Sequence, residues 1–227
     1  MEKTIKEIEE FFATYPGTKS NSGFYQMLFN IFPPHTAYFE LFGGSGEIAR
    51  RKKLSCRNII NDINPDIAQM LLTIMPEEYT ITSMPAGALL DKYDRPDHLF
   101  YLDPPYIKSA RRDPKDIYQF EMTDNDHEQL LKQITTMMAM VVISGYDNDL
   151  YQDYLSEWNS CSIEVMTHAG PATETIWYNY SRPIELHDYR YIGKDFTDRQ
   201  RIKRKRFNIL KRIASLPEVE RNAFFII

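Results

Sequence analysis

The sequence has few of the residues that form disulfide frameworks, metal clusters or membrane spans. Its two cysteines, Cys56 and Cys161, cannot make a disulfide framework or a four-ligand metal site, and we expect both to be buried, reduced thiols. The five histidines show no spacing typical of metal ligands. No apolar run reaches the roughly 18 residues that a membrane span needs, and the polar, acidic N-terminus is unlike a secretory signal. We therefore expect a cytoplasmic protein that binds no metal and no membrane.

The chain also lacks the overall positive charge of many nucleic-acid-binding proteins, since its net charge is −5. The positive charge is strongly localised, however. Residues 199–212 contain eight Lys or Arg residues and no acid, so the rest of the chain carries −13. A local basic stripe matters more for phosphate binding than the sum over the chain. The alternative is a helix that packs through its apolar side and leaves the basic side solvated; the apolar residues are Ile202, Ile209, Leu210, Ile213 and Leu216.

What the chain does contain is enough apolar residues, 43% of 227, for one domain with a sizeable core. Its patterning predicts strands over 37–41, 58–61, 79–82, 98–102, 140–144, 162–167 and 174–180. Helices are predicted over 5–14, 66–74, 86–93 and 123–138. Two more are predicted, one after the turn at 15–17 that ends at 32 and one after residue 46 that ends near 53. This alternation is typical of an α/β fold, with helices on both faces of a mostly parallel seven-stranded sheet and an antiparallel edge strand. We expect a single domain, 1–227, with a basic helical extension over about 182–227.

A glycine-rich turn follows the first predicted strand, in residues 39–46 (Phe-Glu-Leu-Phe-Gly-Gly-Ser-Gly). Glycines let a backbone pass close to a ligand, and the following helix N-terminus favours electronegative groups. A purely structural tight turn fits the same residues. The spacing is not that of a dinucleotide site, and no phosphate-binding Lys-Ser/Thr follows.

Asp62 lies at the end of the next predicted strand, where ligands of parallel sheets bind. An acid at this place can accept hydrogen bonds from both ribose hydroxyls of a nucleoside. The alternative is a helix N-cap, formed by Asp62 or Asn64 before Pro65. The glycine turn upstream favours the nucleoside site.

The sequence Asp103-Pro104-Pro105-Tyr106 follows the apolar strand over 98–102. Two prolines stiffen the loop, which presents two acceptors, the Asp103 carboxylate and the Pro104 carbonyl, beside the Tyr106 ring. These groups suit an amino group on a flat heterocycle, because the acceptors hold its hydrogens while the ring stacks. The position of the loop after this strand makes a chance occurrence a poor explanation.

In these motifs the chain resembles the Dam-type adenine-specific DNA N6-methyltransferases, and the resemblance extends over nearly the whole sequence. The matching segments, in the order of that family, are 15–19, the glycine turn, Asn61-Asp62, the loop 103–106, and residues 144–147 and 174–180. The resemblance implies a class I S-adenosylmethionine-dependent methyltransferase fold. It also implies transfer of a methyl group from S-adenosylmethionine to the N6 amino group of an adenine flipped out of double-stranded DNA.

The same resemblance implies roles for individual residues. The residues implied to bind the cofactor are Tyr15, Lys19, Glu40, Phe42, Gly43, Gly44, Gly46, Asp62, Ile63 and Asp103, with Asp62 on the ribose and the turn beside the methionine part. Asp103, Pro104 and Tyr106 would be catalytic, and Tyr106, Lys108 and Tyr118 would contact the substrate base or its DNA. His127, after the helix-cap signal at Thr123, is expected to be structural.

The chain departs from the family at two places. Only 40 residues separate Asp62 from Asp103, so the helical target-recognition insert of the relatives is absent. DNA recognition then requires short or relaxed specificity, readout through residues 108–124, or a specificity partner or second subunit. The second departure follows residue 81, where relatives carry an acid for the cofactor adenine and this chain has Ser83 as a substitute.

Two other functions fit the same residues. Related loops methylate adenine in RNA or amide nitrogens in proteins. A non-enzymatic alternative is an inactive methyltransferase-like subunit that binds nucleic acid for a partner. The intact loop at 103–106 argues against this alternative, because Asp103 has little purpose without chemistry.

Overall fold

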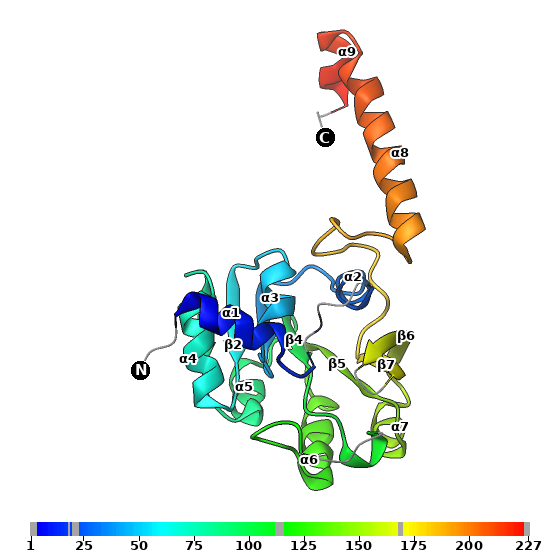
Figure 1. The fold of residues 1–227 in the computed structure, drawn as a ribbon. Coiled ribbons are helices and arrows are strands. Elements are labelled where there is room, and N and C mark those ends of the chain that lie inside the picture. Colours follow the sequence, from blue (N-terminus) through cyan, green and yellow to red (C-terminus); the bar gives the residue numbers. More distant parts are fainter. Residues whose placement is uncertain (1–3, 18, 20–22, 112–115, 168–169, 225–227) are drawn as a thin grey trace.

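Seven strands form one sheet at the centre of the computed structural model, which describes residues 4–17, 19, 23–111, 116–167 and 170–224 (Figure 1). The strands are β1 (Ala37–Glu40), β2 (Arg57–Asn61), β3 (Tyr79–Thr82), β4 (His98–Leu102), β5 (Met140–Tyr146), β6 (Asn159–Thr167) and β7 (Gly170–Tyr178). Their order is β3-β2-β1-β4-β5-β7-β6. All pairs from β3 to β5 are parallel, and β7 is antiparallel to both β5 and β6. The predicted α/β fold, with antiparallel pairing at one edge, is confirmed.

Helices cover both faces of this sheet. One face packs against α1 (Ile5–Ala13), α2 (Phe24–Phe29), α3 (Glu47–Arg51) and α4 (Pro65–Ile74). The other face packs against α5 (Ala86–Tyr93), α6 (Asp124–Ile134) and α7 (Asp149–Leu155). A short 3-10 helix, η1 (Lys108–Ala110), lies in the loop between β4 and α6.

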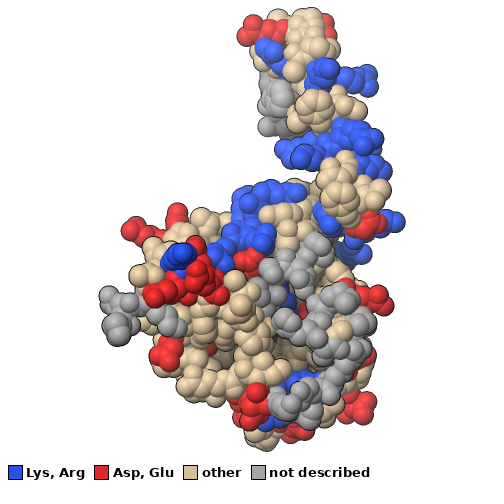
Figure 2. Space-filling view, in the orientation of Figure 1, with Lys and Arg blue, Asp and Glu red and all other residues tan. Residues whose placement is uncertain are grey.

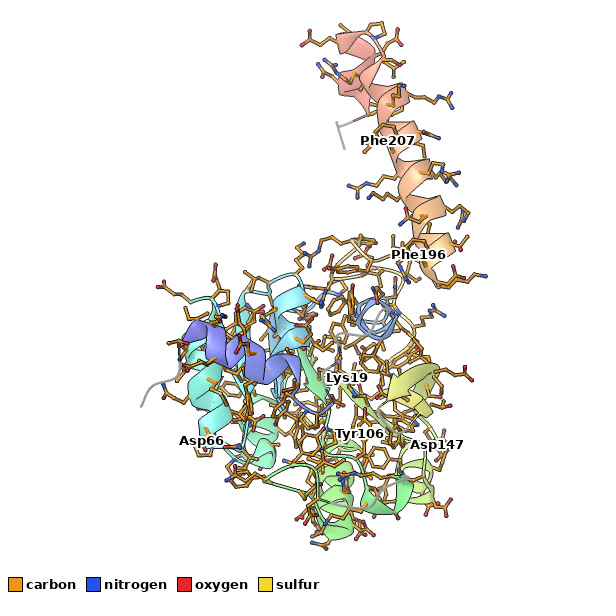
Figure 3. All side chains as sticks on the ribbon, viewed as in Figure 1. Lys19, Asp66, Tyr106, Asp147, Phe196 and Phe207 are labelled. Carbon is orange, nitrogen blue, oxygen red and sulfur yellow. The ribbon has the colours of Figure 1, made fainter. Side chains whose placement is uncertain are left out.

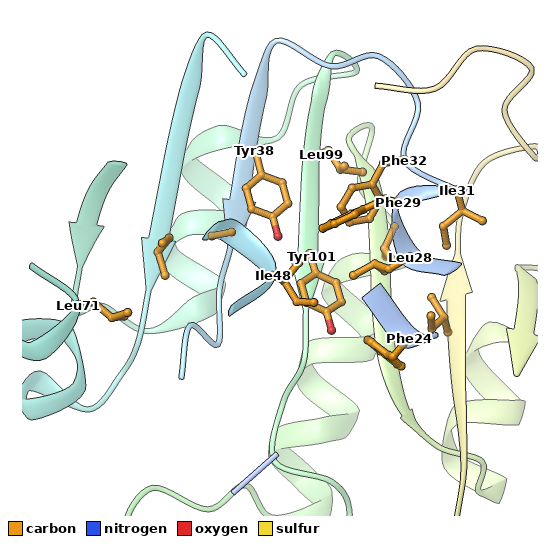
Figure 4. Close-up of a cluster of buried hydrophobic side chains, with 14 of the residues drawn as sticks. Phe24, Leu28, Phe29, Ile31, Phe32, Tyr38, Ile48, Leu71, Leu99 and Tyr101 are labelled. Atoms are coloured by element: carbon orange, nitrogen blue, oxygen red, sulfur yellow. The ribbon is translucent and has the colours of Figure 1, made fainter. Parts of the chain in front are cut away.

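Alternating side chains of the central strands supply the two halves of the core. Tyr38 and Tyr101 point to the first face, where Figure 4 shows them beside Phe29 and Phe32 of the α2 region. Phe39 and Phe100 point to the other face and stack with ring centroids 4.4 Å apart. Because β1 and β4 are buried on both faces, they read as continuous apolar runs, as expected for central parallel strands.

Local sequence fixes the starts of the helices that follow the functional loops. The Asn64 side chain accepts a hydrogen bond from the Asp66 N–H, and Pro65 occupies the first turn of α4. Thr123 caps α6 in a capping box with Asp126. The prediction of a cap at Thr123 is confirmed, and Asn64 rather than Asp62 caps α4.

Several predicted boundaries are wrong. Helix α6 ends at Ile134, not at residue 138, because the hydroxyls of Thr135 and Thr136 bond to carbonyls of the preceding turn. Helix α2 covers only six residues, and α7 had not been predicted. Cys56 is exposed and Cys161 half-buried, which contradicts the expected burial of both thiols.

The chain after β7 crosses the amino-terminal edge of the sheet before it leaves the body. The ring of His187 stacks on that of His35, two residues before β1, with centroids 4.0 Å apart. Helix α8 (Phe196–Ala214) then projects outward and is followed by α9 (Glu218–Ala223) (Figure 1). Within the described ranges, neither these helices nor any other is long and apolar enough to span a bilayer.

Candidate active site

A cleft of about 550 Å³ opens at the carboxyl ends of β1, β2 and β4. Parallel sheets bind their ligands at this edge. Ten of the predicted site residues line the cleft: Tyr15, Lys19, Glu40, Phe42, Gly43, Gly44, Asp62, Ile63, Asp103 and Tyr118. Segments far apart in sequence therefore meet at one site, as the positions of the motifs after strand ends had predicted.

The glycine turn after β1 forms one wall of the cleft. The Gly43 N–H donates to the Asn61 carbonyl at 2.7 Å, and a Cβ on Gly43 would lie 2.5 Å from the Ile60 side chain. Gly44 has a φ of +48°. Gly46, with a φ of +67°, caps α3 and is absent from the cleft lining; a Cβ there would meet Leu71 instead. The turn thus requires glycine both beside the cleft and against the core.

Asp62, directly after β2, lies against this turn. Its Oδ2 accepts a hydrogen bond from the Gly44 N–H and its Oδ1 accepts one from the Asn64 N–H, both at 2.9 Å. Burial raises the pKa of Asp62 and the two N–H donors oppose that rise. The carboxylate is therefore held by the backbone of the glycine turn, at the edge of the cleft.

Asp103 belongs to a buried group of charges centred on Lys19. Its Oδ1 lies 3.3 Å from the Lys19 ammonium and accepts a hydrogen bond from the Ser144 hydroxyl at 2.8 Å. The Lys19 ammonium also donates to both carboxylate oxygens of Glu174, at 3.2 Å each. The side chains of Lys19, Asp103 and Glu174 are only 8%, 16% and 9% exposed. One buried ammonium thus faces two carboxylates.

Burial and charge act in opposite directions in this cluster. Burial acts to lower the pKa of Lys19, but the carboxylates of Asp103 and Glu174 outweigh it and raise that pKa above its usual value. Burial raises the pKa of Asp103, assisted by Glu174 and opposed by Lys19. Lys19 remains an ammonium, and the basicity of the Asp103 carboxylate is increased.

Glu40 is a second buried acid in the cleft. Its Oε2 accepts a hydrogen bond from the Tyr38 hydroxyl at 2.9 Å. Burial raises the pKa of Glu40 to about 8, against the effect of this hydrogen bond. At neutral pH the Glu40 side chain is therefore mostly protonated.

The predicted substrate-side residues are less uniformly placed. The Lys19 ammonium donates to the Tyr106 hydroxyl and lies 4.7 Å from the centre of that ring, whose other neighbour is the Tyr146 ring at 4.5 Å. Pro104 is buried, and Pro105 contributes to the cleft lining. Lys108 forms an ion pair with Asp116 and is absent from the cleft lining.

Tyr118 closes the cleft from the loop between η1 and α6. A Cβ on Gly17 would clash with the Tyr118 hydroxyl, so the two loops are in close contact. Glu121 holds this loop. It accepts hydrogen bonds from the Ile117 and Tyr118 N–H groups and makes a two-bond ion pair with Arg111.

Other predicted residues have structural contacts. Ser83 donates to the Ile63 carbonyl at 3.3 Å and does not line the cleft, so its role as a substitute for the missing acid gains no support. His127 is fully buried, 3.1 Å from the Tyr151 hydroxyl, and burial lowers its pKa to about 4. Thr18 and His168 lie outside the described residues. Within those residues, no His, Cys, Asp and Glu side chains are grouped to hold a metal ion.

The fold is that of the class I S-adenosylmethionine-dependent methyltransferases. The precorrin 8W decarboxylase of Methanobacterium thermoautotrophicum superposes with a TM-score of 0.50 and 11% identity, over 74% of this chain and 95% of that chain. The O-methyltransferase TomG of Streptomyces achromogenes, solved with S-adenosylmethionine, superposes with a TM-score of 0.49 and 12% identity. The superposition covers 80% of this chain and 91% of that chain. The first likeness concerns the fold alone, and the second, with a TM-score below 0.5, carries no argument.

Sequence comparison is more specific. The family model of the D12 class N6 adenine-specific DNA methyltransferases matches residues 73–169, a segment that contains the loop 103–106. No curated protein matches the chain. The predicted resemblance is confirmed over the matched segment. The chain is a methyltransferase, and the predicted cofactor, S-adenosylmethionine, agrees with this class.

One member of the site had not been assigned a role from the sequence. Glu174 lies in a segment that carried the resemblance, yet no contact was predicted for it. It pairs with Lys19 across 155 residues of sequence. The signal that could have found it is the position of an acid on a strand, β7, that pairs with the strand after the loop 103–106.

Proposed function

We propose that the chain transfers a methyl group from S-adenosylmethionine to the N6 amino group of an adenine flipped out of double-stranded DNA. The observation that carries the proposal is the position of Asp103. It begins the loop 103–106 at the cleft, anchored through Oδ1 by Lys19 and Ser144, inside the segment that matches the D12 class.

The cleft fits the cofactor in size and charge. Its volume, about 550 Å³, lies within the range of about 300–1,000 Å³ typical of small-molecule sites. S-adenosylmethionine is a cation at sulfur, and the cleft wall carries the carboxylates of Asp62 and Asp103. Asp62 would accept hydrogen bonds from the ribose, with the glycine turn beside the methionine part and Tyr15, Phe42 and Ile63 as further walls.

When bound, the cofactor supplies a methyl group made electrophilic by the sulfonium. The protein positions the acceptor nitrogen. The Asp103 carboxylate and the Pro104 carbonyl would accept the two amino hydrogens of adenine, which directs the nitrogen lone pair towards the methyl group. Lys19 and Ser144 both contact Oδ1 of Asp103, so this scheme assigns Oδ2 to the amino group. Positioning and preorganised acceptors account for most of the expected rate gain.

Asp103 is also suited to receive the proton that the methylated nitrogen must lose. Burial raises the pKa of Asp103, which makes its carboxylate a stronger base than a surface aspartate. The C–S bond electrons remain on sulfur, the new C–N bond uses the nitrogen lone pair, and the excess proton passes to Asp103 and then to solvent.

The aromatic residues of the loops would hold the flipped base. Tyr106 would stack on the adenine ring, with its hydroxyl fixed by Lys19. Tyr118 lines the cleft, and Lys108, which pairs with Asp116, would contact the DNA. Arg111 is held by Glu121 instead. Arg112 and Lys115, neighbours of these basic residues, lie outside the described residues.

Two further expectations stay predictions. One is a single domain with the extension over about 182–227, and the other is a partner or second subunit for specificity.

The test is incubation of the purified chain with methyl-labelled S-adenosylmethionine and, separately, double-stranded DNA, RNA or protein. The proposal predicts label on adenine N6 in DNA. Label in RNA or in protein amide groups with unlabelled DNA would select one of the other methyltransferase functions. Binding of DNA with no label in any substrate would select the inactive subunit.

A further inference from the structure

Helix α8 projects from the protein without a covering layer (Figure 1). None of its nineteen residues, all of which the structure describes, is buried. Phe196 and Phe207, labelled in Figure 3, are 68% and 64% exposed. Most helices in proteins are stabilised by packing of an apolar face, and α8 lacks such packing among the described residues. Most of the surface of α8 is therefore exposed, although Ile202 and Ile213 are half-buried.

The packed-helix alternative from the sequence is wrong for this segment. It required the apolar side of the helix to lie against the domain and the basic side to face solvent. Ile209 and Leu210 of that side are each 48% exposed. The basic residues are consequently not the solvent-exposed face of a helix that packs on the domain.

The charge of α8 identifies the kind of partner. Figure 2 shows Lys and Arg side chains gathered along the projecting helix, and residues 199–212 hold eight of them with no acid. Successive residues of a helix point about 100° apart, so Arg204 and Arg206 leave the axis on nearly opposite sides. A helix in a groove of duplex DNA has phosphates on both flanks, which matches this distribution.

Other occupants fit less well. A second copy of the helix would place like charges face to face, which is unfavourable. A membrane surface would need a wide apolar face opposite the basic one, whereas basic residues occur on several sides of α8. Charge complementarity therefore favours a polyanion with charges on both sides of the helix.

We propose that α8 is an arm that binds the phosphate backbone of double-stranded DNA without reading its sequence. The choice of DNA rests on the proposed function, and the arm extends that function by assigning a second DNA contact. The arm supplies affinity that the missing recognition insert would otherwise contribute.

The position of α8 separates this contact from the target base. The cleft opens at the carboxyl edge of the sheet, whereas the segment before α8 lies at the amino edge, where the His187 N–H donates to the Phe32 carbonyl at 2.9 Å. The arm therefore binds DNA outside the base pairs around the flipped adenine. It tethers the enzyme to a long molecule and raises the local concentration of target sites.

The test measures binding of the full chain to a fluorescein-labelled duplex of about 40 base pairs and arbitrary sequence, over a range of salt concentrations. In the test variant Arg204, Lys205 and Arg206 are changed to Gln, which keeps helix propensity. Circular dichroism checks that the helix content is unchanged. The inference predicts a log–log salt slope smaller by about 2 to 3, and hence an affinity loss on the order of 10²-fold or more at about 0.1 M salt.

A matched control removes three exposed positive charges from the body, by Lys53→Gln, Lys92→Gln and Arg95→Gln. The control should bind like the wild type. Wild-type binding and slope in the α8 variant would overturn the inference, and so would an equal loss in the control, since affinity would then follow net charge alone.

Methyl transfer separates this inference from the proposed function. On a short duplex at saturating concentration, the α8 variant should methylate at the wild-type rate, while on long DNA below saturation it should be slower. If the wild type methylates no DNA but the α8 variant binds DNA more weakly than the wild type, the proposed function is wrong and the DNA-binding role of α8 is supported. If the wild type methylates DNA and the salt slope is unchanged in the α8 variant, only the DNA-binding role of α8 is wrong.

Discussion

The ammonium nitrogen of Lys19 lies 3.3 Å from Oδ1 of Asp103, so the N-terminal loop and the loop 103–106 meet through one buried ion pair. Glu174 completes the pair from β7 by accepting two hydrogen bonds from the same ammonium. A buried charge is tolerated only when it is paired and hydrogen-bonded, which these contacts provide. The cluster therefore fixes the carboxylate on which the proposed chemistry depends.

The first prediction concerns Glu174→Gln. Glu174 contributes to the raised pKa of Asp103, because its negative charge disfavours ionisation of a neighbouring carboxyl. Removal of that charge should lower the pKa of Asp103, so the acidic limb of the pH–rate profile should shift to lower pH. Glu164→Gln, an exposed change on β6, is the matched control and should leave the profile unchanged. An unshifted limb in Glu174→Gln would contradict a role for Glu174 in setting the state of Asp103.

The second prediction concerns cofactor binding by Asp62. Hydrogen bonds to a charged group are worth about 1.5–3 kcal/mol, so Asp62→Asn should weaken S-adenosylmethionine binding roughly 10- to 100-fold in calorimetry. Asp66→Asn is the control, since Asp66 is exposed on α4 and lies away from Lys19 and Tyr106 in Figure 3. Equal affinities of the two variants would show that Asp62 supports the turn without contacting the ribose.

The motifs predicted these sites because each follows a strand whose end is fixed by the sheet. Asp62 follows β2 and Asp103 follows β4, and parallel pairing brings both to one edge. The Lys19–Glu174 contact could not be predicted in the same way. It joins a loop to a strand 155 residues away and depends on how β7 enters between β5 and β6.

The third prediction follows from the buried Glu40. Its pKa is raised from 4.5 to about 8, so the folded state holds this proton more tightly than the unfolded state. Stability from Glu40 is therefore fully present below about pH 4.5 and declines as the pH rises towards about 8. The side chain in Glu40→Gln stays neutral at every pH. The free energy of unfolding of this variant, relative to that of the wild type, should therefore increase by up to about 4 kcal/mol between pH 5 and pH 8. Denaturant titrations without cofactor measure this, and a constant difference would refute it.

The fourth prediction concerns the loop that carries Tyr118. Arg111 and Glu121 are 5% and 12% exposed, and Arg111 helps to lower the pKa of Glu121 to about 2, against the effect of burial. Breaking a buried pair costs about 3–5 kcal/mol, whereas exposed pairs contribute about 0–1 kcal/mol. Arg111→Gln should therefore speed hydrogen exchange of the Ile117 and Tyr118 amides, which donate to Glu121, on the order of tenfold or more.

The control for this loop is Lys132→Gln, which removes an ion pair to Glu128. The side chains of Lys132 and Glu128 are 49% and 37% exposed. It should leave exchange at both amides unchanged. If Arg111→Gln exchanges at the wild-type rate, the ion pair does not hold the loop over the cleft.

The helices were less predictable than the strands and functional loops. Helix α7 begins after Asn148, in a segment whose few apolar residues, such as Tyr151 and Leu155, gave too short a pattern. The apolar side of α8 predicted packing, yet the helix projects from the body with Phe207 exposed. Periodicity shows that a helix has an apolar side, but only tertiary structure or a partner decides whether that side is covered.

The most direct test of the account is methylation mapping by sequencing of DNA from cells that lack adenine methylation of their own and express either the wild type or Asp103→Ala. The loss of preorganised acceptors at the reacting nitrogen should reduce transfer by a factor on the order of 10³. The account predicts N6-methyladenine at defined sites with the wild type and none above background with the variant. The absence of N6-methyladenine with a folded wild-type protein, or equal methylation by Asp103→Ala, would contradict it.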